Sequence, residues 1–205
     1  RTLLSSLQGA AITHVMIKGA DEGVEFLPGV VESVTDILLN MKGLRVKLLN
    51  GLSGEGKLNI KGKNGKIRVV TGSDMDMSDG CVVLNPDHPI VTVTGTGTFE
   101  ADVRIQLGRG YISAATNQED APKGFTGVDA AYSPIERVRY NVTNARVGHR
   151  TDYDRLTLEV WTDGSIVPED ALGFASNLLR EQVQLFIHFD EEDEPEPQVI
   201  VDESP

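Results

Sequence analysis

The sequence predicts an α+β protein in which a discontinuous domain, made of antiparallel strands and two packed helices, carries an inserted β-rich domain. Three observations predict it: a long helical apolar pattern near the end of the chain, two long alternating segments before it, and short β-runs in the middle. We expect residues 1–9 and 134–189 to form the discontinuous domain and residues 10–133 to form the inserted one.

The segment Pro168–Phe189 has the pattern of one long helix. Pro168 suits the first helical position, and Glu169 and Asp170 place negative charge where the helix dipole favours it. Two adjacent rows of apolar residues recur at helical spacing, one with Ala171, Ala175, Leu178, Leu185 and Phe189, the other with Leu172, Leu179, Val183 and Phe186. This surface is wider than one sheet requires. We expect part of it to face another subunit; its complete burial within one monomer is the alternative.

Two shorter helices are predicted nearer the start. Arg1–Leu7 has the pattern of the last turns of a helix that begins upstream, and Ala10–Ile17 alternates like a strand. Pro28–Leu44 carries apolar residues at helical spacing, with Gly43 as the C-cap and Lys42 in the last turn.

The stretch from Leu44 to Leu107 predicts an antiparallel β-rich module. Its predicted strands are 44–49, 56–61, 66–70, 81–84, 90–94 and 98–107, with turn signals at Asn50–Gly51, Asn64–Gly65 and Asp79–Gly80. Gly108–Tyr111 ends the module, and residues 115–127 are polar enough to predict a surface loop.

Residues 135–148 and 155–164 alternate apolar and charged residues, which is typical of half-buried strands joined around residues 149–154. Val138, Tyr140 and Val142 are expected on one face of this pair. The long helix follows, and the helix at Arg1–Leu7 is expected to pack against it, which makes the first domain discontinuous in sequence.

Composition limits the class of protein. With 205 residues and 40% hydrophobic residues the chain can bury a real core, and it has no apolar run long enough for a membrane span, so we expect a soluble protein without membrane contact. The single cysteine, Cys81, fits a reducing compartment. Eight of the 31 acidic residues lie in residues 190–205, which contain no Lys or Arg and predict a disordered acidic linker or tail. The remainder lacks the basic excess of a nucleic-acid-binding chain.

The pattern of reactive residues predicts no catalytic residue, cofactor site or metal site in this chain. The four histidines share no spacing, and the Asp74, Asp76 and Asp79 run does not fit a calcium-binding loop. Gly108–Gly110 resembles part of a phosphate cradle, but no Lys-Ser/Thr pair follows it. A binding or assembly protein is therefore favoured over an enzyme with its own active centre.

Five segments, in order, resemble the amino-terminal domain of the alpha subunit of bacterial and plastid DNA-directed RNA polymerase. They are Arg1–Ser6, Asp36–Leu44, Gly108–Tyr111, Val128–Ile135 and Arg150–Leu156. In that family the discontinuous domain is a dimerisation domain, and a longer amino-terminal stretch precedes the position of Arg1. The resemblance therefore implies that the dimerisation domain is N-terminally truncated here.

The resemblance implies a non-catalytic scaffold of a nucleotidyltransferase complex, which dimerises and nucleates assembly of the beta and beta-prime subunits for transcription. The dimer interface that it implies comprises Leu3, Leu7, Leu178, Leu185, Phe186 and Phe189. Contact with the large subunits falls on Arg1 and Leu4, toward beta, and on Lys42, Val128 and Asp129 of the inserted domain.

The family also implies omega and sigma subunits in the full complex, with Mg and Zn held by partner subunits and none by this chain. DNA contact in the family belongs to a separate C-terminal domain beyond the acidic linker. The location implied is the bacterial cytoplasm, with the plastid stroma as the alternative. Two other functions stay open from the residues alone: a stand-alone dimeric adaptor, and a small-molecule-binding β-rich protein that uses the Gly108–Tyr111 loop.

Overall fold

The computed structural model of the chain describes residues 1–20, 23–62, 65–95, 97–147 and 150–186. The predicted acidic tail at residues 190–205 and the predicted interface residue Phe189 lie outside these ranges. Within them, no helix is long and apolar enough to cross a membrane.

The α+β class is confirmed, since the described residues form many short and mostly antiparallel strands with a few helices. In chain order the elements are α1 (Thr2–Ser5), β1 (Gln8–Ile17), α2 (Val34–Lys42), β2 (Val46–Leu48), β3 (Ser53–Lys61), β4 (Arg68–Thr71), the 3-10 turn η1 (Gly72–Asp74), β5 (Asp76–Met77), β6 (Cys81–Val83), β7 (Pro89–Val93), β8 (Thr98–Arg109), β9 (Tyr111–Ile112), α3 (Ala114–Glu119), β10 (Thr126–Gly127), β11 (Ala130–Ala131), β12 (Ile135–Val147), β13 (Arg150–Thr162) and α4 (Pro168–Gln184).

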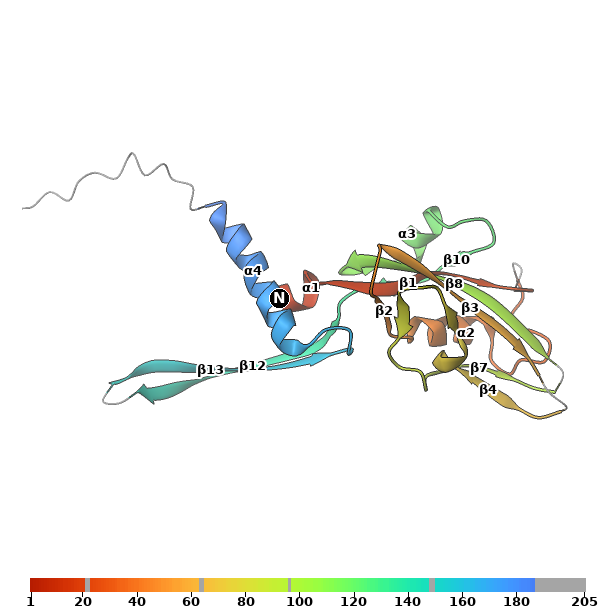
Figure 1. The fold of residues 1–205 in the computed structure, drawn as a ribbon, viewed down its shortest axis with the longest axis horizontal. Helices are drawn as coiled ribbons and strands as arrows, with labels where there is room; N and C mark the ends of the chain where they lie inside the picture. The colour runs from red at the N-terminus through yellow and green to blue at the C-terminus, as the bar shows by residue number, and fades with distance from the viewer. Residues whose placement is uncertain (21–22, 63–64, 96, 148–149, 187–205) are drawn as a thin grey trace, which may run out of the picture.

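A five-stranded antiparallel sheet in the order β10-β1-β8-β3-β5 is the centre of the larger part of the molecule. β1 pairs with β8 from Gln8, opposite Arg109, to Ile17, opposite Ala101. The register shifts between Ile12 and His14, so one extra residue, Thr13, stands in β1. Figure 1 shows α2 and the β4–β7 pair on one side of this sheet and α3 on the other.

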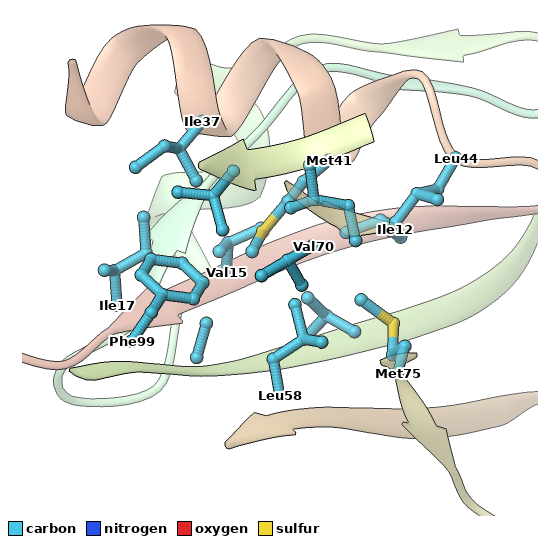
Figure 2. Packing of buried hydrophobic residues seen from close by; sticks show 14 of the residues in the cluster. Ile12, Val15, Ile17, Ile37, Met41, Leu44, Leu58, Val70, Met75 and Phe99 are labelled. Atoms are coloured by element: carbon cyan, nitrogen blue, oxygen red, sulfur yellow. The ribbon is translucent and has the colours of Figure 1, made fainter. Parts of the chain in front are cut away.

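The larger core lies between this sheet and α2. Ile37 and Met41 of α2 are fully buried, and they pack in one cluster with Ile12 and Val15 of β1 and with Phe99 of β8 (Figure 2). Alternate residues of β8 point into this cluster, as expected for a sheet with one covered face. Burial of these side chains is the main source of stability for this part of the chain.

The predicted start of α2 is wrong, because the helix begins at Val34, six residues after Pro28. The helix begins after Ser33, whose hydroxyl accepts a hydrogen bond from the Asp36 amide at 3.1 Å, and not at Pro28. Before it, Gly29 has φ +76° and its carbonyl accepts the Thr94 amide, and Val30 bridges to Val93. Pairing with the end of β7 therefore holds this segment extended, although its apolar spacing is helical. The predicted C-cap at Gly43 is confirmed.

The predicted surface loop at residues 115–127 is also wrong, because it contains α3 and β10. Ser113 caps α3 by accepting the Thr116 amide, and Asn117 is buried although it is polar. The side-chain amide of Asn117 donates to the Val128 carbonyl at 2.6 Å, and this hydrogen bond offsets the cost of burying the Asn117 side chain. The polar composition of this segment therefore gave no indication that α3 packs against the sheet.

Strands β12 and β13 form a separate two-stranded hairpin (Figure 1). The second strand begins at Arg150, so most of the predicted connection at 149–154 is strand. The remaining predicted strands all overlap observed ones, and the short strands β5, β9, β10 and β11 were not predicted. The long helix begins at Pro168 as predicted and ends at Gln184, five residues before the predicted end; residues 187–189 lie outside the described part.

A second, smaller core joins the hairpin to α1 and α4. Its buried members are Leu7, Ile135, Ala171 and Ala175, with Leu3, Val138, Val160, Ile166 and Leu178 packed partly against them. The small side chains Ala171 and Ala175 let α4 approach the hairpin closely. The larger cluster shares no residue with this one, and a third, small cluster of Ala11, Ala130 and Tyr132 is separate from both.

The α2 packing gives a matched pair of mutations. Met41→Ala removes a fully buried side chain and is expected to lower the free energy of unfolding by about 2–5 kcal/mol. Leu39→Ala removes a side chain that is 58% exposed on the same helix and should cost less than about 1 kcal/mol. Urea unfolding of the two variants measures the difference; equal losses would contradict the assignment of the buried face.

Candidate subunit interfaces

Helix α4 and the turn that follows it present an apolar row that nothing in the described chain covers, which we call the outer row: Leu172, Leu179, Val183 and Phe186. The inner row meets the smaller core, where Ala171 and Ala175 are buried and Leu178 is half-buried. Side chains of the outer row are between 40% and 77% exposed. Leu185, a predicted interface residue at the C-cap, is also exposed. Contiguous exposed apolar surface of this kind is typical of a protein interface.

Helix α1 divides its side chains between the core and the surface. Leu3 and Leu7, four residues apart, face the smaller core, where Leu7 is 5% exposed. Leu4 and Arg1 are exposed. The structure therefore brings Leu3 and Leu7 together with Leu178, as the sequence predicts. The Leu7 side chain, however, is used within the chain and supports the packing of α1 rather than offering surface.

An open hollow of ≈ 510 Å³ lies where α1 and the start of β1 meet α4. Its apolar wall includes Ile166, Phe174 and Leu178, and its rim carries Arg109 and Glu181. Phe174 is 57% exposed and also lines a second hollow beside β2. The apolar surface near α4 is therefore larger than the outer row alone.

The hairpin continues this apolar surface beyond the smaller core. Val138 pairs with Val160 beneath α4, and the next pairs on the same face are Tyr140 with Leu158 and Val142 with Leu156. These last four side chains are exposed, so the predicted alternation is confirmed, but only its first pair is covered. The chain leaves a long apolar face without a partner among its described residues.

On the larger part of the molecule, Lys42 and Asp129 meet. The Lys42 ammonium donates to the Asp129 carboxylate at 3.0 Å, and the Ala114 amide donates to the same carboxylate at 2.8 Å. The hydrogen bond from Ala114, then that from Lys42, and the nearby Tyr111 hydroxyl lower the pKa of Asp129 from 3.8 to about 2. The same carboxylate raises the pKa of Tyr111. We call Lys42, Tyr111 and Asp129 the polar cluster.

Val128, predicted beside Asp129, is 6% exposed and belongs to the larger core. Its amide donates to the Thr13 carbonyl at 2.9 Å, and its carbonyl accepts the Asn117 amide. Both its backbone groups and its side chain are thus used inside the chain. Its contribution to a surface is to fix the position of Asp129.

Buried His14 of β1 helps to fix the position of the polar cluster through hydrogen bonds. Its Nε2 donates to the Asn117 carbonyl at 2.9 Å, so Nδ1 is free to accept the Thr13 hydroxyl at 2.8 Å. This chain of contacts runs from the bulge in β1 through α3 to the Val128 backbone. The bulge therefore positions the loop that carries Asp129. No pattern in the sequence predicted this bulge.

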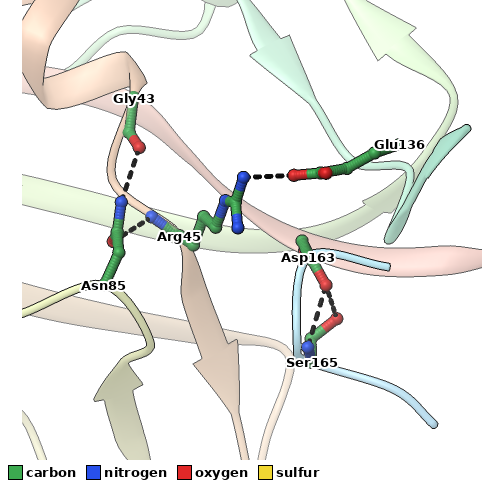
Figure 3. Close-up of polar contacts among 6 residues, drawn as sticks. All are labelled: Gly43, Arg45, Asn85, Glu136, Asp163 and Ser165. Carbon is green, nitrogen blue, oxygen red and sulfur yellow. Dashed lines mark hydrogen bonds and ion pairs between the residues drawn. The ribbon is translucent and has the colours of Figure 1, made fainter. Parts of the chain in front are cut away.

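A second polar contact joins the two cores. Arg45, which follows α2, donates to the Glu136 carboxylate at the start of β12 (Figure 3). Asn85 holds the Arg45 backbone by accepting its amide at 2.8 Å, and it donates to the Gly43 carbonyl at 3.0 Å. Both charged side chains are nearly half exposed, so the pair adds little to the stability of the fold. Its main effect is to position the start of β12 relative to the end of α2.

Asp74 and His88, two of the residues weighed for chemistry, have structural partners. Asp74 accepts the Thr71 amide and pairs with Arg68 at 2.5 Å, and His88 donates to the Asn40 carbonyl at the end of α2. In the described ranges no three His, Cys, Asp or Glu side chains gather closely enough to hold a metal ion. Gly108 lies on the Tyr132 ring, where a Cβ would approach Cε1 to 2.7 Å, so close packing accounts for this glycine.

Sequence reasoning missed Tyr111 and Ala114 as partners of Asp129, and Arg45 and Glu136 as a link between the cores. Tyr111 closes the Gly108–Tyr111 motif, and that was the available signal. The other contacts join residues far apart in sequence, such as Arg45 and Glu136, and pair spacing cannot reveal them.

Comparisons with known proteins match this architecture. Residues 15–133 match the family model described as RNA polymerase Rpb3/RpoA insert domain. The DNA-directed RNA polymerase subunit alpha of Geobacter metallireducens is 45% identical over 204 residues, which cover 99% of this chain and 59% of that protein. The subunits of the same name from Pelobacter propionicus and Syntrophus aciditrophicus are 44% and 46% identical, over 96% and 91% of this chain and 57% and 53% of theirs.

The chain thus spans between 53% and 59% of the length of these relatives. The resemblance to the amino-terminal domain of bacterial alpha subunits, predicted from five short segments, is confirmed. Because the family model covers more than half of its residues, the chain belongs to the RNA polymerase Rpb3/RpoA insert domain family.

Proposed function

We propose that the chain acts as the alpha subunit of a DNA-directed RNA polymerase, as a scaffold that dimerises and nucleates assembly of the beta and beta-prime subunits. The relatives that carry this name align with nearly the whole chain, which supports the proposal. The observation that carries it is the uncovered apolar surface of α4 and the hairpin, because an assembly subunit needs such surface and a monomer does not.

The dimer interface that we propose is the outer row of α4, together with Leu185 and the exposed side of α1. Leu3 and Leu178 border it, and Leu7 supports it from the core. Phe189 is part of the same proposal on the strength of its helical spacing alone. A second copy that presents the same row would bury both apolar surfaces in an isologous contact.

Docking of the large subunits is proposed at two places. Arg1 and Leu4, both exposed on α1, would contact beta. The polar cluster would contact a large subunit from the other part of the molecule, with Lys42 and Asp129 held by mutual contacts and Val128 fixing the loop. Such preorganisation lowers the entropic cost of binding.

Chemistry and the remaining partners are proposed to lie elsewhere in the complex. Nucleotidyl transfer uses divalent ions held by grouped carboxylates, and these, with a structural zinc, would belong to the partner subunits. Omega and sigma would complete the enzyme, and DNA would be contacted by a separate C-terminal domain. The residues at 1–9 and 134–189 would form the dimerisation unit and those at 10–133 the docking unit. The proposed location is a bacterial cytoplasm, or else a plastid stroma.

A stand-alone dimeric adaptor would also use the outer row, and recovery of the native partners separates the two functions. The chain, tagged and expressed in its source cells, is expected to recover two very large proteins. Lys42→Glu should reduce that recovery roughly fivefold or more, because it breaks the polar cluster. Lys57→Glu, an exposed change on β3, is the control and should have no effect. Recovery of no large protein by the unmodified chain would support the adaptor instead.

The proposed dimer interface is tested by placing charge on the outer row. Val183→Asp with Phe186→Asp should weaken self-association by roughly 100-fold or more, since two apolar side chains leave the interface and two charges enter it. Light scattering should then report the monomer mass of 22.2 kDa. Asn177→Asp with Gln184→Asp adds the same charge to the opposite side of α4 and should leave the dimer intact. A normal dimer from the first variant rules out the outer row.

The polar cluster predicts a pH dependence. Asp129 titrates near pH 2 in the folded chain and near 3.8 when unfolded, so its ionised form favours folding, fully above about pH 4 and progressively less down to pH 2. Asp129→Asn should therefore be less stable than the unmodified chain at about pH 6, and the difference should shrink by about pH 2.5. Urea unfolding at both pH values measures it, with Asp76→Asn, exposed on β5, as the control. A difference that does not change with pH would refute the role of ionised Asp129.

A further inference from the structure

The hairpin has a second face, opposite the one that packs under α4. Its cross-strand pairs are Arg137 with Trp161, Arg139 with Glu159, Asn141 with Thr157, Thr143 with Arg155 and Ala145 with Tyr153. Arg137, Arg139 and Arg155 are exposed on it, and we call it the arginine face. It lies on the side of the hairpin away from the smaller core, so the proposed dimer interface leaves it free.

The arginine face is basic in an acidic protein. Among its described side chains three arginines stand against one acid, Glu159, which lies 3.6 Å from Arg139. The whole chain carries a net charge of −12. A local excess of positive charge on a negatively charged chain favours binding of an acidic partner through charge complementarity.

The arginine face also carries aromatic side chains. The Arg137 guanidinium lies 3.7 Å from the centroid of the Trp161 ring, and Tyr153 stands near the other end of the ladder. Beside Arg139 a shallow hollow of ≈ 380 Å³ is lined also by Asn141, Thr157 and Glu159. One arginine held over an aromatic ring, and another next to a side-chain amide and a hydroxyl, are well suited to bind carboxylates.

We propose that the arginine face binds the acidic segment of this same chain, residues 190–196. That segment, DEEDEPE, has six carboxylates and no basic residue, so its charge is complementary to the face. Attachment to α4 gives it an effective concentration that reaches millimolar values for a short tether, which an external acidic partner would have to exceed.

The segment is long enough to reach the face. Ala175 of α4 packs against the hairpin, and Phe186 lies eleven residues further along the chain, about 16 Å at the rise of an α-helix. Residues 187–196 span roughly 33 Å when extended. The return along α4 takes about 16 Å of this length and leaves about 17 Å for the passage around one edge of the two-stranded hairpin, so the carboxylates toward Glu196 are the ones placed to meet the face.

Binding of this kind is mainly electrostatic, and it depends on salt. The three arginines are exposed, so each contact with a carboxylate is weak and is screened when the Debye length falls to about 3 Å at 1 M salt. The proposed contact would therefore be reversible. An external polyanion, such as a nucleic acid, would have to displace the segment.

Trp161 is the only tryptophan of the chain and lies within the arginine face, so it reports on the proposed contact directly. Quenching of its fluorescence by iodide is measured in the full chain at low salt. Replacing each Asp and Glu of residues 190–196 with Asn or Gln should raise the quenching constant about twofold, because iodide gains access to the arginines. At about 1 M salt the two chains should be quenched equally.

The same neutralisation in variants that lack arginines or lysines separates a specific contact from general charge repulsion. With Arg139→Gln and Arg155→Gln, which leave Arg137 on Trp161 unchanged, neutralising residues 190–196 should no longer alter the quenching. With Lys57→Gln and Lys61→Gln, on β3, the twofold effect should persist. An effect of equal size in the arginine-poor background, or no effect in the unmodified one, overturns the proposal.

A nucleic acid as the true occupant is the remaining outcome. A single-stranded oligonucleotide added at low salt should give Trp161 of the unmodified chain no further protection from iodide, because the acidic segment already occupies the face. Protection by the oligonucleotide that does not depend on whether residues 190–196 are acidic would refute the assignment to the chain's own segment. The measurement does not depend on dimerisation, so it can fail or succeed independently of the proposed scaffold function.

Discussion

The pairing of β1 with β8 is the interaction on which most of the structure depends. β1 follows Leu7 directly, so one strand joins the smaller core to the larger one, and its ladder with β8 runs its full length. The extra residue at Thr13 turns His14 to the outer face, where it holds α3. Without this bulge, the alternation of β1 would continue unchanged and the loop that carries Asp129 would lose its support.

The second constraint is that the hairpin and α4 carry more apolar surface than the chain covers. Only Val138 and Val160 lie beneath α4, whereas the next two pairs and the outer row are exposed. Burying this surface against another protein would contribute stability that the smaller core, with four buried residues, supplies poorly by itself. Folding and association are therefore expected to be linked at this end of the molecule.

Local patterns predicted the fold class, the β-rich middle and the start of α4, because alternation and helical spacing are imposed by burial on one face. They failed where tertiary contacts override spacing: Gly29 and Val30 pair with β7, and a polar segment folds as α3 around Asn117. For the interfaces, sequence identified Lys42 and Asp129 only through resemblance. It could not show that they touch, nor that Leu7 and Val128 are buried, since both facts depend on long-range packing.

The exposed Arg45–Glu136 pair has one further consequence. It joins two cores that share no side chain, and an exposed pair adds about 1 kcal/mol or less to their coupling. The hairpin and α4 can then open as a cooperative unit of their own while the central sheet stays folded. Amide hydrogen exchange would register such an opening as two classes of protection within one chain, and the faster class would include the helix that carries the outer row.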